Sequence, residues 1–216
     1  MEGLELLLNE RTLLIDGITS TLYIAFISLI FSVFGGFIVG FIRNSKIPVL
    51  SIIARIQLES FRIVPLMVWL FLAFFTLPTL LGFNISGNTA VIIVFTLWGS
   101  AEMGDLVRGA LQSLPVIQRE SGTALGLTNF QLFRYILFPQ ALRRLMPGIV
   151  NMATRLIKTS SMASLVGVIE IVARGRHIIE RTQEPFIIFT FIFFLFFFLC
   201  WPLSIWAKHL EKKSAL

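Results

Sequence analysis

The sequence has very little of the chemistry that enzymes and metal sites use. Its 216 residues include one cysteine and two histidines. Cys200 alone allows neither a disulfide framework nor a cysteine-based metal site. His177 and His209 lie far apart in the chain, so neither a zinc-binding H-E-x-x-H helix nor a Ser/His/Asp triad can be assembled around them. These absences argue against an enzyme.

The sequence also lacks a phosphate-binding loop. It contains no G-x-x-x-x-G-K-[ST] segment, and no G-x-G-x-x-G follows a strand. We therefore expect the chain not to bind ATP by either means, and we expect no metal or cofactor in it.

Charged residues are scarce, at 14% of the chain, whereas soluble domains usually carry about 25%. Hydrophobic residues make up 56%, including 22 phenylalanines, which indicates an integral membrane protein. The net charge of +6 would suggest nucleic acid as a partner of a soluble protein, but cytoplasmic loops of membrane proteins collect Lys and Arg in any case. We therefore expect a lipid bilayer around the chain and no nucleic acid.

Hydrophobic runs predict an all-α protein, because a spanning helix needs about 20 mostly apolar residues. The five expected spans are about 18–42, 63–82, 89–110, 146–169 and 185–207. They leave an N-terminal segment, 1–17, a connecting segment of about 113–144, and a tail, 208–216.

The distribution of Lys and Arg predicts the orientation of the spans. The segment 43–62 has four basic residues against one acid, 108–144 has five against one, and the tail has three Lys against Glu211. By contrast, 1–17 holds four acids and one Arg, which is also the reverse of a signal peptide, so we expect no cleaved targeting segment. The N-terminus is expected outside, in the periplasm, and the C-terminus in the cytoplasm.

Small residues repeat at every fourth position along the first span, at Ser28, Ser32, Gly36 and Gly40. This spacing lets two helix backbones approach closely in lipid, where packing drives association. The partner is expected to be another span of the same chain or, alternatively, a second subunit.

Several polar residues lie inside expected spans. Glu102 and Asp105 lie in the third, and Asn151, Arg155 and Lys158 fall within about 60° of one another on the fourth. A helix that starts near residue 146 places Lys158 about 18 Å deep, close to the middle of a ~30 Å hydrocarbon core.

An ionised group at that depth costs at least about 2.5 kcal/mol, so it should face a partner or a wet cavity. Two interpretations stay open. Glu102 or Asp105 can neutralise Arg155 or Lys158 in an internal ion pair, or these side chains can line a substrate pathway. The candidate pathway residues are Glu102, Asn151, Arg155, Lys158 and Ser160.

The connecting segment has the start and stop signals of two short helices. Ser113 and Pro115 are expected to begin the first, and Gly126 is expected to end it. Thr128 and Gln131 fit a capping box at the start of the second, with Leu127 and Leu132 in the flanking staple positions.

The second short helix is expected to end by Phe138, because Pro139 disfavours a helical residue before it. Phe130, Phe133 and Leu137 form an apolar stripe that is expected to lie on the membrane domain. Such a helix can dock into a groove on another protein. Alternatively, it can lie on the membrane surface.

The same segment resembles the cytoplasmic loop of type I ABC importer permeases. The family pattern is E-A-A, three residues, G, nine residues, I, one residue, L-P. The matching residues are Glu120, Ser121, Gly122, Gly126, Ile136 and Pro139. Ser121 and Gly122 replace the two alanines, and Phe138 replaces the leucine.

Within that superfamily the chain is most similar to the polar amino-acid permeases. "FRIVPLMVWLFLAFFTLP" resembles their F-R-G-T-P-L-L-V-Q-L-F-F, "LFPQALRRLMPGIVN" resembles L-P-Q-A-L-R-R-x-x-P, and "LIKTSSMASLVGV" resembles L-x-K-D-T-S-L-x-S-x-I-G-V. The chain departs from the pattern at Thr159, where many relatives have Asp, and at Glu102, where many have Tyr.

The resemblance implies a type I transmembrane domain in the bacterial inner membrane, working as a dimer with a second copy or a similar permease. It further implies two partner ATPase subunits that hold ATP and Mg, an amino-acid-binding protein outside, and a coupling role for the segment around Gly126. A stand-alone channel, a proton-coupled carrier, an intramembrane enzyme and an importer for another small polar solute are the rival hypotheses.

Overall fold

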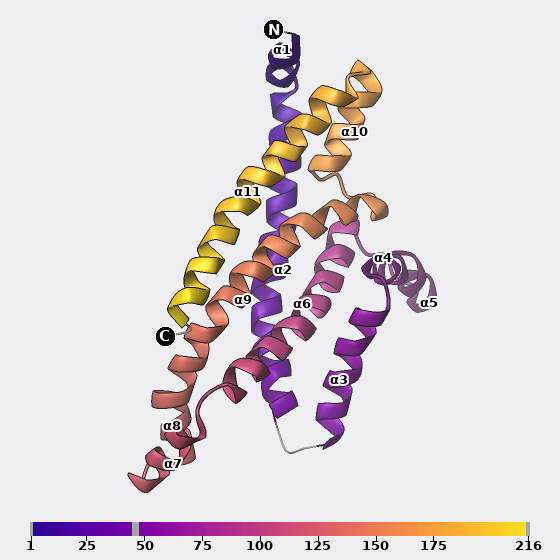
Figure 1. Ribbon diagram of the computed structural model, residues 1–216. Helices are drawn as coiled ribbons and strands as arrows, with labels where there is room; N and C mark the ends of the chain where they lie inside the picture. Colours follow the sequence, from indigo (N-terminus) through magenta and orange to yellow (C-terminus); the bar gives the residue numbers. More distant parts are fainter. Residues whose placement is uncertain (1, 45–47, 215–216) are drawn as a thin grey trace.

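The computed structural model describes residues 2–44 and 48–214, which contain helices and no strand. Figure 1 shows an elongated bundle, with α1 at one end and α7 and α8 at the other. The α-helices are α1 (Glu2–Asn9), α2 (Arg11–Asn44), α3 (Pro48–Ile63), α4 (Leu66–Phe71), α5 (Leu77–Leu81), α6 (Gly87–Gln112), α7 (Val116–Ala124), α8 (Asn129–Leu132), α9 (Phe138–Thr159), α10 (Ile171–Thr182) and α11 (Pro185–Ser214). Two π-helical turns, Leu72–Thr76 and Phe133–Leu137, and a 3₁₀ segment, Ser160–Val166, join some of them.

Three of the expected spans fall within long helices. In the described parts of the chain, α2, α6 and Pro185–Lys213 of α11 are each long and apolar enough to cross a membrane, and five spans result if each of two bent helix pairs counts as one. The helices extend beyond the expected limits: α2 begins at Arg11, inside the expected N-terminal segment, and α11 continues to Ser214, through most of the expected tail.

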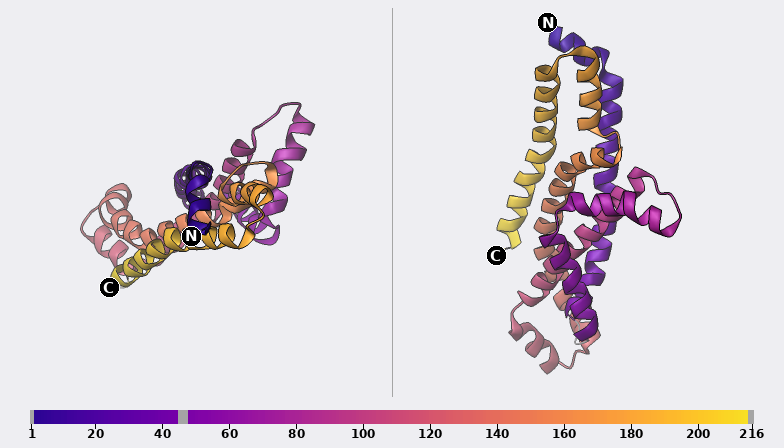
Figure 2. Two further views of the ribbon diagram at one scale, coloured as in Figure 1. Left: turned by 90° about the horizontal axis from the view of Figure 1, so that it is seen from above. Right: turned by 90° about the vertical axis from the view of Figure 1, so that its right-hand side faces the viewer.

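The expected span 63–82 is not a single helix. A bend of 109° separates Pro48–Ile63 from Leu66–Leu81. Pro65 lies at the bend, with φ −55° and ψ 135°, so the backbone is extended there and the preceding helix ends. The segment α4–α5 consequently projects sideways from the bundle (Figures 1 and 2).

The expected span 146–169 is also interrupted. The helix α9 ends at Thr159, the 3₁₀ segment follows, and α10 then leaves at an angle of 55°. The segment 170–184, between the last two expected spans, contains the helix α10, whose first turn lies against α2: a Cβ on Gly17 would be 2.9 Å from Cα of Ile171.

The small-residue stripe of α2 packs within the chain, against α6. Ser32 donates a hydrogen bond from Oγ to the Phe95 carbonyl, at 3.3 Å. A Cβ on Gly40 would lie 2.6 Å from Cβ of Val107, and one on Gly36 would collide with Met103. The expectation of an intramolecular partner is thus confirmed.

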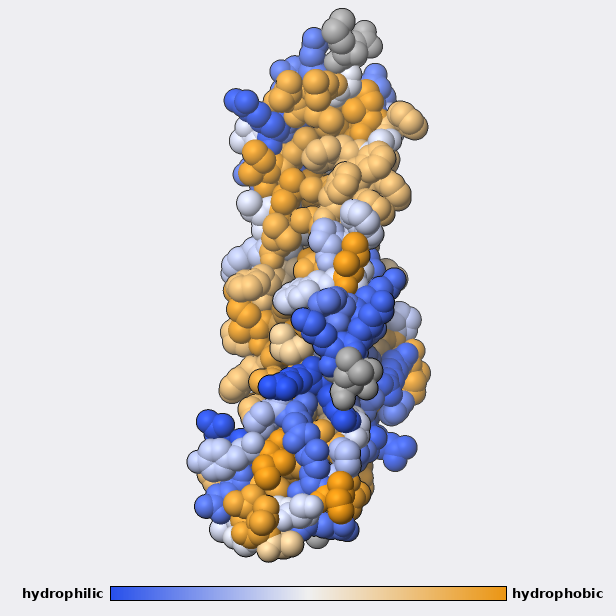
Figure 3. Space-filling model, turned by 60° about the vertical axis from the view of Figure 1, so that its left-hand side comes forward, coloured by the Kyte–Doolittle hydropathy of each residue, from blue (hydrophilic) through white to orange (hydrophobic). Residues whose placement is uncertain are grey.

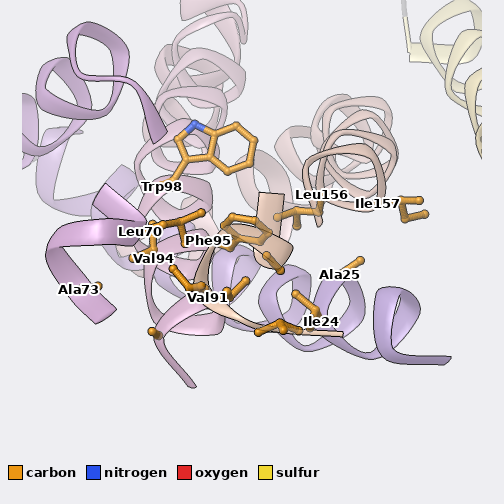
Figure 4. Packing of buried hydrophobic residues seen from close by; sticks show 14 of the residues in the cluster. Ile24, Ala25, Leu70, Ala73, Val91, Val94, Phe95, Trp98, Leu156 and Ile157 are labelled. Atoms are coloured by element: carbon orange, nitrogen blue, oxygen red, sulfur yellow. The ribbon is translucent and has the colours of Figure 1, made fainter. Parts of the chain in front are cut away.

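The main core lies between α2, α4, α6 and α9 (Figure 4). Ile24, Val91, Phe95 and Leu156 are fully buried there and face one another. Two smaller hydrophobic cores lie toward the ends of the molecule. One lies between α6, α8 and α9, and the other lies between α1, α2, α10 and α11.

Candidate functional site

The segment after α6 begins with a short helix, α7, as expected, and a second helix starts at Asn129. Pro115 is the N-cap residue of α7, and Gly126 ends it in the left-handed conformation, with φ 77°. Its backbone N–H donates to the Thr123 carbonyl, at 3.0 Å. A glycine is required there because L side chains rarely adopt this conformation.

The capping box at the start of α8 is confirmed. The Gln131 N–H donates to Oγ1 of Thr128, at 3.3 Å, and the Thr128 N–H donates to Oε1 of Gln131, at 2.9 Å. Gly122 is buried under this turn: a Cβ on it would lie 3.6 Å from Cδ1 of Leu127 and would press on Leu132. Its small size therefore allows α7 and α8 to pack together.

Three details of this segment differ from the expectation. Ser113 does not start α7, because it caps the end of α6, where its carbonyl accepts a hydrogen bond from Nη1 of Arg144, at 2.6 Å. Phe130 does not pack on the membrane domain, because its side chain is 73% exposed. Pro139 does not end the helix that begins at Asn129.

A π-helical turn explains why Pro139 is tolerated. The Phe138 N–H donates to the Phe133 carbonyl, five residues back, and α9 continues through Pro139. Pro139 has no backbone N–H, so a regular α-helix would lose a hydrogen bond at this position. The wider π turn leaves room for the proline ring there. The helical path from Asn129 to Thr159 is thus unbroken.

The tip of the segment exposes large apolar side chains. Leu125 is 79% exposed, and Val116, Ile117, Phe130 and Tyr135 are exposed beside it. In Figure 3 the upper half of the molecule is mostly hydrophobic, and a hydrophilic zone lies below it. At the lower end, hydrophobic patches reappear among hydrophilic residues.

The remaining residues of the expected loop pattern differ in how far they are exposed to solvent. Glu120, Ser121 and Pro139 are exposed, and Ile136 is half-buried. Glu120 has no ion pair within the described part of the chain.

Glu102 of α6 forms the ion pair that was one of the two expected alternatives. Its Oε2 lies 3.2 Å from Nη1 of Arg155 on α9, and its Oε1 lies 3.6 Å from Nε of Arg62 on α3. The Arg155 guanidinium also lies over the Trp98 ring, 4.8 Å from its centroid. Both carboxylate oxygens of Glu102 thus face arginines of this chain.

Asp105, one turn further along α6, binds Arg62 as well and adds Arg43, and neither arginine was expected in the site. Oδ1 lies 2.7 Å from Nη1 of Arg43 on α2, and Oδ2 lies 3.0 Å from Nη2 of Arg62. The Arg43 side chain is only 8% exposed. Arg43 and Arg62 lie in the last turns of α2 and α3, and this was the signal that the sequence offered. A position at a helix end does not identify Asp105 as the partner.

The other expected pathway residues are more dispersed. Asn151 donates from Nδ2 to Oε1 of Glu211 on α11, at 3.3 Å, beside a cleft of about 710 Å³ that Asp105 and Arg144 also line. Lys158 lies instead near Cys200 and Trp201 of α11, with no carboxylate of the described residues within 4.0 Å.

Ser160 does not join this surface. It is fully buried, and its hydroxyl donates to the Ile157 carbonyl, at 2.7 Å. Its role in a substrate pathway stays a prediction, as do the roles of the exposed members.

A fully buried carboxylate, Glu170, was not anticipated. It caps α10: Oε2 accepts from the Val172 N–H at 2.8 Å and Oε1 from the Ala173 N–H at 2.9 Å. The sequence did contain a signal for this helix cap, because a Glu stands directly before an amphipathic run in "VIEIVARG".

Residues 32–215 match the family described as binding-protein-dependent transport system inner membrane component. The chain belongs to this family. It is 35% identical over 202 residues to the probable glutamine ABC transporter permease protein GlnP of Bacillus subtilis, covering 92% of each chain. It is 29% identical over 207 residues to the glutamine transport system permease protein GlnP of Escherichia coli K12, covering 94% of each.

Solved structures have the same fold. An amino acid ABC transporter crystallised with histidines superimposes with a TM-score of 0.88 at 24% identity, with 96% of each chain covered. The MetNI methionine ABC transporter, in an inward-facing conformation, gives 0.74 at 22% identity, covering 95% of this chain and 98% of that one. The chain therefore has the fold of a type I ABC importer transmembrane domain.

Family membership establishes the general role and location. The binding-protein-dependent permease is a transport subunit of the bacterial inner membrane, and its family works with ATPase subunits and a substrate-binding protein.

Proposed function

We propose that this permease takes up an amino acid, in an importer driven by ATP bound with Mg on partner ATPases. The chain itself performs no catalysis and holds no cofactor. Near full-length similarity to permeases named for glutamine and other amino acids supports this substrate class.

The observation that carries the mechanism is the unbroken helix from Asn129 to Thr159. Its first turn lies in the segment that we assign to ATPase docking, and its last two turns carry Arg155 and Lys158. At 1.5 Å per residue it spans about 45 Å. Movement of an ATPase at one end therefore displaces the candidate pathway residues at the other as part of a rigid body.

The proposed orientation follows from this arrangement and from the distribution of basic residues. The α7–α8 end faces the cytoplasm, and α1 and α10 face the external binding protein. The substrate crosses between two permease subunits, past the surface that carries Glu102, Asn151, Arg155 and Lys158. The two broken spans support this pathway, because interrupted helices typically surround substrate sites in transporters.

Reconstitution tests the function. Vesicles that contain the permease, its ATPase and internal ATP should accumulate a labelled amino acid only when the binding protein is supplied outside. Omission of ATP, the ATPase or the binding protein should each abolish uptake. Uptake that survives without the ATPase would favour a channel or proton-coupled carrier instead.

The docking assignment predicts the effect of reversing a charge on α7. We expect Glu120→Lys to insert and fold normally but to lower binding-protein-stimulated ATP hydrolysis at least about tenfold, because a misplaced charge at an interface costs several kcal/mol. Glu120→Gln is the matched control, because it nearly keeps the size of the side chain without introducing the opposite charge, and it should retain most of the stimulation. Unchanged stimulation in the Glu120→Lys variant would contradict docking at this helix.

A further inference from the structure

The candidate pathway and the ion pairs beside it contain more cations than carboxylates. The two carboxylates are Glu102 and Asp105, and the cations are Arg43, Arg62, Arg155 and Lys158. Charged residues at the edge add equal numbers of both signs: Glu59, Arg108, Arg144 and Glu211. An excess of positive charge therefore remains, and it favours anions over cations at this surface.

Glu102 and Arg155 match the two charged groups that an amino acid carries at its α-carbon. Oε2 of Glu102 lies 3.2 Å from Nη1 of Arg155, so an acceptor and a donor for a substrate adjoin each other. The Arg155 side chain is 48% exposed, and a guanidinium has further N–H donors for a substrate carboxylate. The other contact of Glu102, with Arg62, is longer, at 3.6 Å, so the carboxylate keeps acceptor sites for a substrate ammonium group.

Lys158, one helical turn beyond Arg155, has no such partner. No carboxylate of the described residues lies within 4.0 Å of it. It lines a groove of about 440 Å³ whose other residues belong to α11 and include Phe193, Phe197 and Trp201. Lys158 is the single charged residue among the described residues that line this groove. An ammonium group among aromatic side chains at membrane depth requires an anion or water beside it.

The tendency of basic residues to gather in cytoplasmic loops does not explain the position of Lys158. The helix α9 begins at Phe138, and Lys158 lies about 30 Å further along it. In Figure 1 this part of α9 runs beside α11, well above the α7–α8 end. A substrate that passes along this surface can therefore supply the anion that the described chain does not.

The spacing of the two cations on α9 suits a substrate with two carboxylates. Arg155 and Lys158 lie three residues apart, so their Cβ atoms are about 5–6 Å apart on the same side of the helix. An amino acid whose α-carboxylate is bound at Arg155 can reach Lys158 with a carboxylate at the end of a short side chain.

We propose that this permease carries anionic amino acids. Arg155 and Glu102 hold the α-carboxylate and the α-ammonium group, and Lys158 binds the carboxylate of the side chain. This substrate class rests on the proposed function, in which an amino acid passes these residues. A neutral side chain leaves Lys158 unpaired, and a cationic one is repelled by it.

Equilibrium binding to the purified permease–ATPase complex tests the proposal without the external binding protein, whose own selectivity would otherwise contribute. Labelled glutamate should bind at least about tenfold more tightly than glutamine, because an ion pair in a partly buried site is strong. Glutamine is the matched ligand, with nearly the same shape and no charge on its side chain, and arginine should bind more weakly still. Equal affinities for glutamate and glutamine, or no binding of glutamate in the millimolar range, would overturn the proposal.

Substitutions of Lys158 identify the residue that makes the selection. Lys158→Gln should weaken glutamate binding about tenfold and leave glutamine binding nearly unchanged. Lys158→Arg should keep the preference for glutamate, and Lys158→Glu should reverse it in favour of arginine. Lys208→Gln on α11 is the control, because Lys208 is exposed but lies outside the groove, and it should change neither affinity. Equal weakening of glutamate and glutamine binding in Lys158→Gln would indicate a purely structural lysine and contradict the proposal.

Binding and uptake keep this proposal distinguishable from the proposed function. ATP-dependent uptake of an amino acid by a complex that shows no preference for glutamate would overturn the role of Lys158 alone. A preference that depends on Lys158, in a transporter that accumulates no amino acid, would leave the binding site standing and overturn the proposed uptake.

Discussion

Gly104→Leu is expected to remove most of the folded permease from the membrane. A Cβ at this position would lie 2.5 Å from Cγ1 of Val39 and 3.2 Å from the backbone nitrogen of Gly40. The backbone of α2 cannot move aside as a flexible side chain can, so α2 and α6 must separate. Overpacking of a well-filled core typically costs about 1–3 kcal/mol, and a leucine against backbone should exceed that range.

Thermal unfolding of the purified protein in detergent measures the effect. Gly109→Leu is the control on the same helix, because no atom lies within 4 Å of a Cβ there, and it should unfold at or above the original temperature. Gly104→Ala should fall between the two. Equal unfolding temperatures of the two leucine variants would show that close packing of α2 against α6 is not required for the stability of the permease.

Asp105→Ala is expected to destabilise the permease by about 3 kcal/mol or more. The Arg43 guanidinium lies 2.7 Å from the Asp105 carboxylate, and its side chain is 8% exposed, so the substitution leaves a nearly buried cation without its closest anion. Breaking a buried pair from one side typically costs about 3–5 kcal/mol, whereas replacing both partners costs much less.

A double-mutant cycle provides the test. Arg43→Leu combined with Asp105→Leu should recover most of the stability that either Arg43→Leu or Asp105→Leu loses alone. Asp16→Ala is the control: Asp16 lies 3.9 Å from Arg174 and is exposed, so its removal should cost about 1 kcal/mol or less. If the double substitution is no more stable than the single ones, Arg43 and Asp105 act independently.

Local signals in the sequence predicted local structure well. The capping box at Thr128 and Gln131 and the helix stop at Gly126 depend on neighbouring residues only, and both are present. Hydropathy also located the spans that lie in continuous helices. It could not locate the bend at Pro65, because apolar residues continue on both sides of it. It could not locate the end of α9 at Thr159 either, because a window of about 20 residues averages over the short polar run 158–161.

The error at Phe130 comes from its place at the tip of the segment. Phe130 lies in the first turn of α8 and is 73% exposed, whereas Phe133 is half-buried and Leu137 is buried further along the same helical path. A stripe predicted from spacing alone does not show where the surface that it packs against ends.

The charge cluster was predictable only in part. Glu102 and Arg155 could be paired because both lie deep in expected spans. Arg43 and Arg62 lie in other helices, and which helices adjoin α6 depends on packing that a single sequence does not reveal.

The length of α2 has a mechanical consequence. Its 34 residues span about 51 Å, well beyond the ~30 Å hydrocarbon core. Near its start Gly17 lies against Ile171 of α10, and at its end Arg43 binds Asp105. Because a continuous helix barely changes length, α2 acts as a strut: a push on α10 at one surface reaches the charge cluster near the other without passing through α9.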